Sequence, residues 1–114
     1  MAKGNHLGDL EELVLLSALR LKDEAYGARI RNQLIESADR SVSISTIYVT
    51  LMRLEEKGYV RSWMGEPSGV RGGKAKRFFG LSQEGIEALQ ATRNVRDQMW
   101  EGVEASLDAD ARVG

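Results

Sequence analysis

The chain has 114 residues, 42% hydrophobic and 29% charged, which suits one small globular domain rather than a disordered or membrane protein. It has no cysteine, one histidine (His6) and no apolar run near the roughly 18 residues of a membrane span, so we expect a cytoplasmic protein without metal, cofactor or membrane partner. The net charge of −1 argues, as a total, against a nucleic-acid partner.

The first predicted helix runs from Leu10 to Leu21, with Asp9 as its N-cap. Its eight apolar residues surround the axis instead of forming one stripe. A helix that is apolar all round must be covered on more than one side, and so short a chain covers only one. We therefore predict that a second subunit covers the other side, through Leu10, Leu13 and Leu16.

Two further helices are predicted in the middle of the chain. The first of them spans Tyr26–Ala38 and has one apolar side. The second begins near Ser43 or Ser45 and ends at Gly58, because glycine favours helix C-termini. The short polar segment between them predicts a tight turn, so this part of the chain is a helix-turn-helix.

The helix before Gly58 has one buried stripe, formed by Ile47, Leu51 and Leu54 at i, i+4 and i+7. The residues on the other sides of this helix are predicted to be exposed: Ser45, Thr46, Tyr48, Val49, Met52 and Arg53. Two of them, Ser45 and Thr46, place small hydroxyl groups at its amino end. Short side chains at a helix amino terminus suit phosphate contact. Two roles of Tyr48 stay open. Its hydroxyl contacts a phosphate group, or its ring is half-buried by packing and its hydroxyl faces water.

A β-hairpin follows this helix. Tyr59–Met64 and Lys76–Leu81 are predicted strands because they are rich in β-branched and aromatic residues. The segment between them holds four glycines and the only proline, which predicts a flexible loop. Helix, turn, helix and ribbon together predict a mostly α-helical winged helix-turn-helix with a two-stranded β wing.

The last predicted helix starts at Ser82 and reaches Ser106. Its 25 residues are about 37 Å long, whereas a domain of this size has a radius of gyration of only about 13 Å. The helix must therefore project, and we predict that the same helix of a second copy buries its apolar stripe, including Leu89, Val103 and Leu107. The predicted organisation is a DNA-binding domain at 1–81, with its first helix also in the dimer interface. A dimerisation helix at 82–107 and a frayed tail at 108–114 follow.

Charge is distributed unevenly along the chain. Residues 1–39 carry −2, residues 40–81 carry +5 and residues 82–114 carry −4. The positive block coincides with the predicted helix-turn-helix and wing, so near-neutrality of the total excludes nothing.

Four short motifs in this order resemble the PadR family of bacterial transcriptional regulators, in its short form. They are LGDLEEL at 7–13, YGARI at 26–30, STIY at 45–48 and KRFFGLSQEG at 76–85. The resemblance covers about residues 8–106. Phe78 and Phe79 stand where the family usually has tyrosines, so any role of those hydroxyls is absent here.

The resemblance implies a homodimer built by the first and last helices, with the third helix of each subunit in a major groove of double-stranded DNA. Two half-sites of a roughly palindromic operator would lie about 34–36 Å apart. The protein would be a repressor. The expected DNA contacts are on the third helix and the wing: Ser45, Thr46, Tyr48, Val49, Arg53, Arg71, Lys74, Lys76 and Arg77.

Some members of the family bind aromatic compounds between the last helices. Trp100, with Met99 and Val103, would face such a space and offer a flat stacking surface to a small aromatic effector. The alternative for Trp100 is simple packing in the dimer interface.

Two other classes of function compete with this interpretation. One is a dimeric winged-helix module that binds proteins through its acidic helices. The other is an enzyme, which we do not expect because the sequence shows no paired carboxylates in a plausible cleft, no cysteine and one poorly placed histidine.

Overall fold

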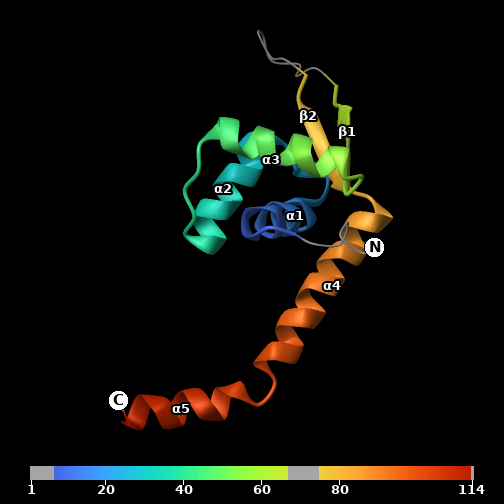
Figure 1. Ribbon diagram of the computed structural model, residues 1–114. Coiled ribbons are helices and arrows are strands. Elements are labelled where there is room, and N and C mark those ends of the chain that lie inside the picture. Colours follow the sequence, from blue (N-terminus) through green and yellow to red (C-terminus); the bar gives the residue numbers. More distant parts are fainter. Residues whose placement is uncertain (1–6, 67–74, 114) are drawn as a thin grey trace.

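The computed structural model describes residues 7–66 and 75–113. In chain order its elements are α1 (Asp9–Leu21), the short 3-10 helix η2 (Lys22–Glu24), α2 (Gly27–Ala38), α3 (Ile44–Glu56), β1 (Val60–Met64), β2 (Arg77–Leu81), α4 (Gln83–Trp100) and α5 (Val103–Val113). Helices α1 to α3 pack together, the two strands rise beside them, and α4 leaves as an arm (Figure 1). The predicted mostly helical winged fold is confirmed.

The hydrophobic core lies where α1, α2 and α3 meet the base of the strands. The predicted stripe of α3 is fully buried, and so are Ile30 and Leu34 of α2. Each position was visible in the sequence because apolar residues recur there at the helical spacing. Burial of this stripe leaves the opposite side of α3 facing solvent.

The wing, β1 with β2, is an antiparallel pair in which Trp63 lies opposite Phe78. The ring of Phe78 stacks on Trp63 at 6.2 Å and meets the edge of Tyr26 at 5.6 Å between centroids. The Phe79 N–H also donates to the Ala25 carbonyl at 2.9 Å. The base of the wing is therefore fixed to the segment that leads into α2.

The helix caps agree with the sequence at two of three positions. Ser43 caps α3 and Ser82 caps α4, each accepting a backbone N–H at 3.1 Å. The N-cap of α1 is Gly8 and not Asp9, because the Glu11 carboxylate takes the Gly8 N–H at 2.9 Å. In a capping box the Glu at the third helical position accepts the N–H of the N-cap residue, and this bond is present here. Glycine has no side-chain oxygen to accept the second hydrogen bond of the box.

The prediction of one continuous last helix is wrong. Helix α4 ends at Trp100, and α5 begins at Val103 after a break at Gly102, whose φ is +79°. Glycine adopts this left-handed conformation without the steric penalty of other residues, so the chain turns there. Helical backbone continues to Val113, beyond the predicted helix end at Ser106, and fraying of the tail at 108–114 stays a prediction. The expected projection is confirmed, since the molecule measures 63 Å along its longest axis.

Candidate nucleic-acid interface

The amino end of α3 is organised by Ser43. Its hydroxyl accepts the Thr46 N–H at 3.1 Å and shares a hydrogen bond of 2.9 Å with the Thr46 hydroxyl. The hydroxyl of Thr46 is thus engaged within the turn, and the Ser45 hydroxyl lies 3.5 Å from that of Ser43, while both side chains remain exposed. The exposed amino terminus of this helix remains a suitable place for a phosphate group.

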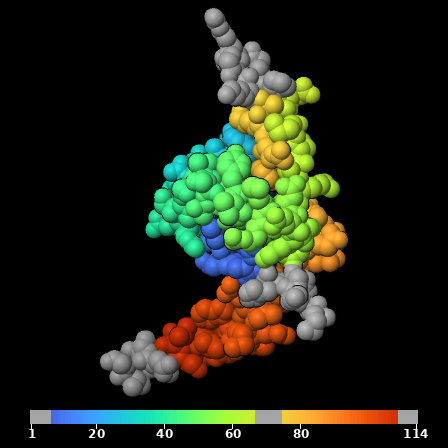
Figure 2. All heavy atoms as spheres, turned by 45° about the horizontal axis from the view of Figure 1, so that its top comes forward, coloured from blue at the N-terminus to red at the C-terminus, as the bar shows by residue number. Residues whose placement is uncertain are grey.

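The predicted contact residues of α3 lie on two sides of the helix. Four of them line a shallow hollow of about 320 Å³ beside Leu10: Ser45, Thr46, Val49 and Arg53. Tyr48 lies on the other side of the helix. The green surface of α3 adjoins the yellow surface of the wing in Figure 2, so helix and ribbon present one continuous face.

Tyr48 packs against the first residue of α2. A Cβ placed on Gly27 would come within 2.6 Å of the ring carbon Cζ and the hydroxyl oxygen of Tyr48. The ring therefore lies directly on the Gly27 backbone, while the side chain keeps 39% of its surface exposed. The packing interpretation of Tyr48 holds for its ring. The sequence showed both residues but not that they touch.

The wing connects to α3 through a short polar chain. Arg77 donates to the Ser62 hydroxyl at 2.9 Å, and that hydroxyl donates to the Glu55 carboxylate at 3.0 Å. Lys76 lies 5.1 Å above the ring of Tyr26, a cation–π contact. Lys76 and Arg77 thus lie at the loop end of the described strands, where Arg77 pairs with Met64, whereas Arg71 and Lys74 lie outside the described residues.

Not every positive charge of the 40–81 block faces this surface. Arg40 pairs with Asp9 at 2.7 Å, and Lys57 pairs with Glu11 at 2.9 Å, both on α1. Burial raises the pKa of Glu11, but the hydrogen bonds from Gly8 and Lys57, with the nearby positive charges, outweigh it and hold the pKa below its usual value.

The remaining described cations of this block are Arg61 on β1 and three residues of the predicted interface. Arg53, Lys76 and Arg77 have no carboxylate within 4.0 Å in the described part of the chain. They therefore keep their charge available for an anionic partner.

The residues predicted to form the dimer interface differ in how far they are exposed. Leu16 and Leu107 are exposed, while Leu10, Leu13 and Val103 are half-buried. Leu89 is only 8% exposed and belongs to the core of its own domain, so its assignment to a subunit interface is wrong. It lies on the first turns of α4, which rest on the domain, whereas only the later turns project (Figure 1).

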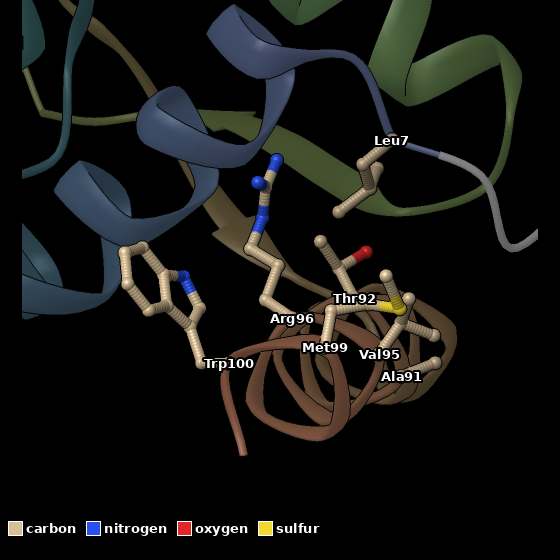
Figure 3. A pocket seen from close by; sticks show the side chains of 7 residues that line it. All are labelled: Leu7, Ala91, Thr92, Val95, Arg96, Met99 and Trp100. Atoms are coloured by element: carbon tan, nitrogen blue, oxygen red, sulfur yellow. The ribbon is translucent and has the colours of Figure 1, made fainter. Parts of the chain in front are cut away.

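A hollow of about 500 Å³ lies between the later turns of α4 and the residues before α1. Its lining is mostly apolar: Leu7, Ala91, Thr92, Val95, Arg96, Met99 and Trp100. Figure 3 shows Leu7 pointing toward Thr92 and Met99, with Trp100 at one end. Two of the three predicted pocket residues are here. Val103 is not, because the break at Gly102 carries it onto α5.

Two absences concern the described residues only. Across 7–66 and 75–108, the acidic side chains form no group suited to a metal ion, and His6 lies outside these ranges. Within the same ranges, no helix is long and apolar enough to cross a membrane.

Two helices joined by a turn, with the second helix exposed beside a basic two-stranded ribbon, define a winged helix-turn-helix protein. The model of the transcriptional regulator PadR-like family matches residues 15–91. The chain belongs to this family. Its members are transcriptional regulators and not enzymes.

Solved structures agree with this assignment. A transcriptional regulator from Streptococcus is 31% identical, with a TM-score of 0.65 over 84% of this chain and 89% of the other. A PadR-like transcription factor from Bacteroides fragilis is 25% identical, with a TM-score of 0.66 over 84% and 87%. A PadR family regulator from Clostridium difficile is 25% identical, with a TM-score of 0.58 over 89% and 97%. The curated proteins contain no match.

Proposed function

We propose that the protein is a cytoplasmic homodimeric repressor that binds a roughly palindromic operator. Each subunit inserts the amino end of α3 into a major groove, and the wing approaches the adjacent phosphate backbone. The observation that carries the proposal is the exposed side of α3 beside three cations, Arg53, Lys76 and Arg77, that form no ion pair among the described residues. Occupancy of the promoter would then exclude the polymerase.

Exposed apolar side chains support a dimer. Leu16 and Leu19 of α1 are exposed on one helix, and Val95, Met99 and Trp100 are exposed on the projecting part of α4. Apolar side chains that cluster in this way outside the core mark an interaction surface. A second copy of the chain is the simplest partner, because one two-fold axis then covers both copies of the surface at once.

The hollow along α4 supports an effector site. Its volume of about 500 Å³ lies within the range of small-molecule sites, and Trp100 with Met99 provides aromatic and polarisable contacts. We propose that an aromatic or apolar compound binds there and relieves repression. Arg96, which pairs with Glu12 of α1 at 3.3 Å, links this hollow to the helix-turn-helix domain.

Fluorescence anisotropy with the DNA upstream of the protein's own gene tests the repressor proposal. Because phosphate neutralisation releases counterions, affinity should fall steeply between about 50 and 200 mM salt. Arg53→Ala combined with Arg77→Ala should weaken binding and flatten this dependence. The matched control is Arg93→Ala, since Arg93 is exposed on α4 and pairs only with Asp97.

Two results would contradict the proposal. A salt-independent affinity, or an equal loss in the Arg93→Ala control, would exclude an electrostatic interface on α3 and the wing. A protein that sediments as a monomer at concentrations where it binds the operator would exclude the dimer.

A further inference from the structure

The outermost residues of α3 form a distinct chemical strip. At 100° per residue, Ser45, Val49 and Met52 lie nearly opposite the buried stripe and so point furthest from the domain. Val49 is 52% exposed and Met52 is 60% exposed. The middle of the exposed side of α3 is therefore apolar, with the polar residues Ser45 and Glu56 at its two ends.

Residues that read bases by paired hydrogen bonds are almost missing from this helix. Ile44–Glu56 contains no Asn, Gln or Lys, and its single arginine, Arg53, lies at the edge of the exposed side. Asn and Gln pair with adenine, and Arg and Lys pair with guanine. Among the polar groups, the Thr46 hydroxyl is bound to Ser43 and the Glu55 carboxylate to Ser62. Between the Ser45 hydroxyl at the amino end of this side and the Glu56 carboxylate at its carboxyl end, Val49 and Met52 offer only apolar contacts.

The major groove presents one apolar feature, the 5-methyl group of thymine. We propose that Val49 and Met52 recognise thymine methyl groups, so that each operator half-site has A·T pairs beneath the middle of α3. This inference rests on the proposed function, because it requires that α3 enter the major groove. The three residues from Val49 to Met52 span about 4.5 Å along the axis, so the two contacts fall on the same or neighbouring base pairs.

The occupant of this strip is DNA and not an apolar protein surface. Cations that form no ion pair among the described residues lie beside it, Arg53 at one edge of the strip and Lys76 and Arg77 on the wing. Placing an apolar protein over the strip would leave these charges without an anion, whereas phosphates on either side of a major groove satisfy them.

The test replaces thymine by uracil in the operator, which removes the methyl group and keeps base pairing. Synthetic duplexes with one replacement at a time, and with all in a half-site, are measured by fluorescence anisotropy. For each contacted methyl we expect binding about three- to fivefold weaker, confined to one or two neighbouring positions. In Val49→Ala and Met52→Ala the ratio of thymine to uracil affinity should approach one. Ile35→Ala, at an exposed apolar residue of α2, should leave the ratio unchanged.

The outcomes separate the two proposals. If the wild-type protein binds thymine and uracil duplexes equally, thymine recognition is wrong while the repressor proposal stands. If the ratio persists in both alanine variants, uracil acts through DNA stiffness and the assignment to Val49 and Met52 is wrong. If no duplex is bound, both proposals fail.

Discussion

Glu11 offers the most direct test of how the helix-turn-helix is held together. It is 7% exposed, and its carboxylate accepts the Gly8 N–H at 2.9 Å and the Lys57 ammonium at 3.0 and 2.9 Å. One side chain thus closes the start of α1 and joins it to the end of α3. We consider the substitution Glu11→Gln, which keeps the shape and the Gly8 bond but removes the charge.

The expected cost follows from these contacts. A hydrogen bond to a charged group contributes about 1.5–3 kcal/mol, but the Lys57 side chain is 36% exposed and returns partly to water when its partner is neutral. We therefore expect a loss of about 1–2 kcal/mol. For a domain of this size each kcal/mol lowers Tm by about 4–8 °C, so Tm should fall by about 4–16 °C.

The pH dependence has a definite sign. The pKa of Glu11 is lowered in the folded protein, so its stabilisation is complete above the ordinary carboxyl pKa and is lost as pH falls through the folded pKa. The difference between wild type and Glu11→Gln should be constant at pH 6–8 and shrink below about pH 4.5. Urea denaturation followed by circular dichroism measures it, at one protein concentration because a dimer's stability depends on concentration.

The control is Glu36→Gln, at an exposed carboxylate of α2. It should change stability by less than about 0.5 kcal/mol. An equal loss in both variants, or a difference for Glu11→Gln that persists at pH 3, would refute the assignment of stability to this contact.

Three other substitutions test the packing and the site. Gly85→Ala places a Cβ 2.1 Å from the Tyr59 carbonyl oxygen, a backbone atom, so thermal denaturation should show a loss of at least about 2 kcal/mol, and an unchanged Tm would contradict this contact. Gly27→Ala must displace the ring of Tyr48, so operator affinity should fall severalfold while Tm changes little; unchanged affinity would show that the position of this ring is irrelevant to binding. Trp100→Ala should abolish quenching of fluorescence by planar aromatic compounds, and replacement of the other tryptophan should preserve it; equal loss in both would exclude the proposed effector site.

Periodicity predicted the parts of this fold that depend on burial. Ile47, Leu51 and Leu54 are buried because apolar residues at helical spacing lie on one side of a helix, and that side turns toward the core. The hairpin was equally visible, since two β-branched and aromatic runs flank a glycine-rich loop. The exposed side of α3 could be predicted in the same step, because it is the part of the helix surface that the buried stripe does not occupy.

Contacts between distant residues were not predictable in this way. Gly27 and Tyr48 are separated by a turn whose geometry no local pattern encodes, and Glu11 meets Lys57 across 46 residues. The break at Gly102 was missed for a different reason. The apolar positions on both sides of it continue on one helical wheel, so only the conformational freedom of glycine marked the turn.

Helix α4 is held to the domain at its first turn, near Gly85, and projects from there as a long arm. The first turn of α4 packs directly against the backbone of Tyr59, the residue before β1, and its 18 residues extend about 27 Å to Trp100. In a dimer joined at the far ends of these arms, a change in tilt of only about 5° displaces each domain by about 2 Å. If the protein is the proposed dimer, its two α3 helices must match half-sites about 34–36 Å apart, and a shift of this size, produced by the proposed effector beside Trp100, would move them out of register with the DNA.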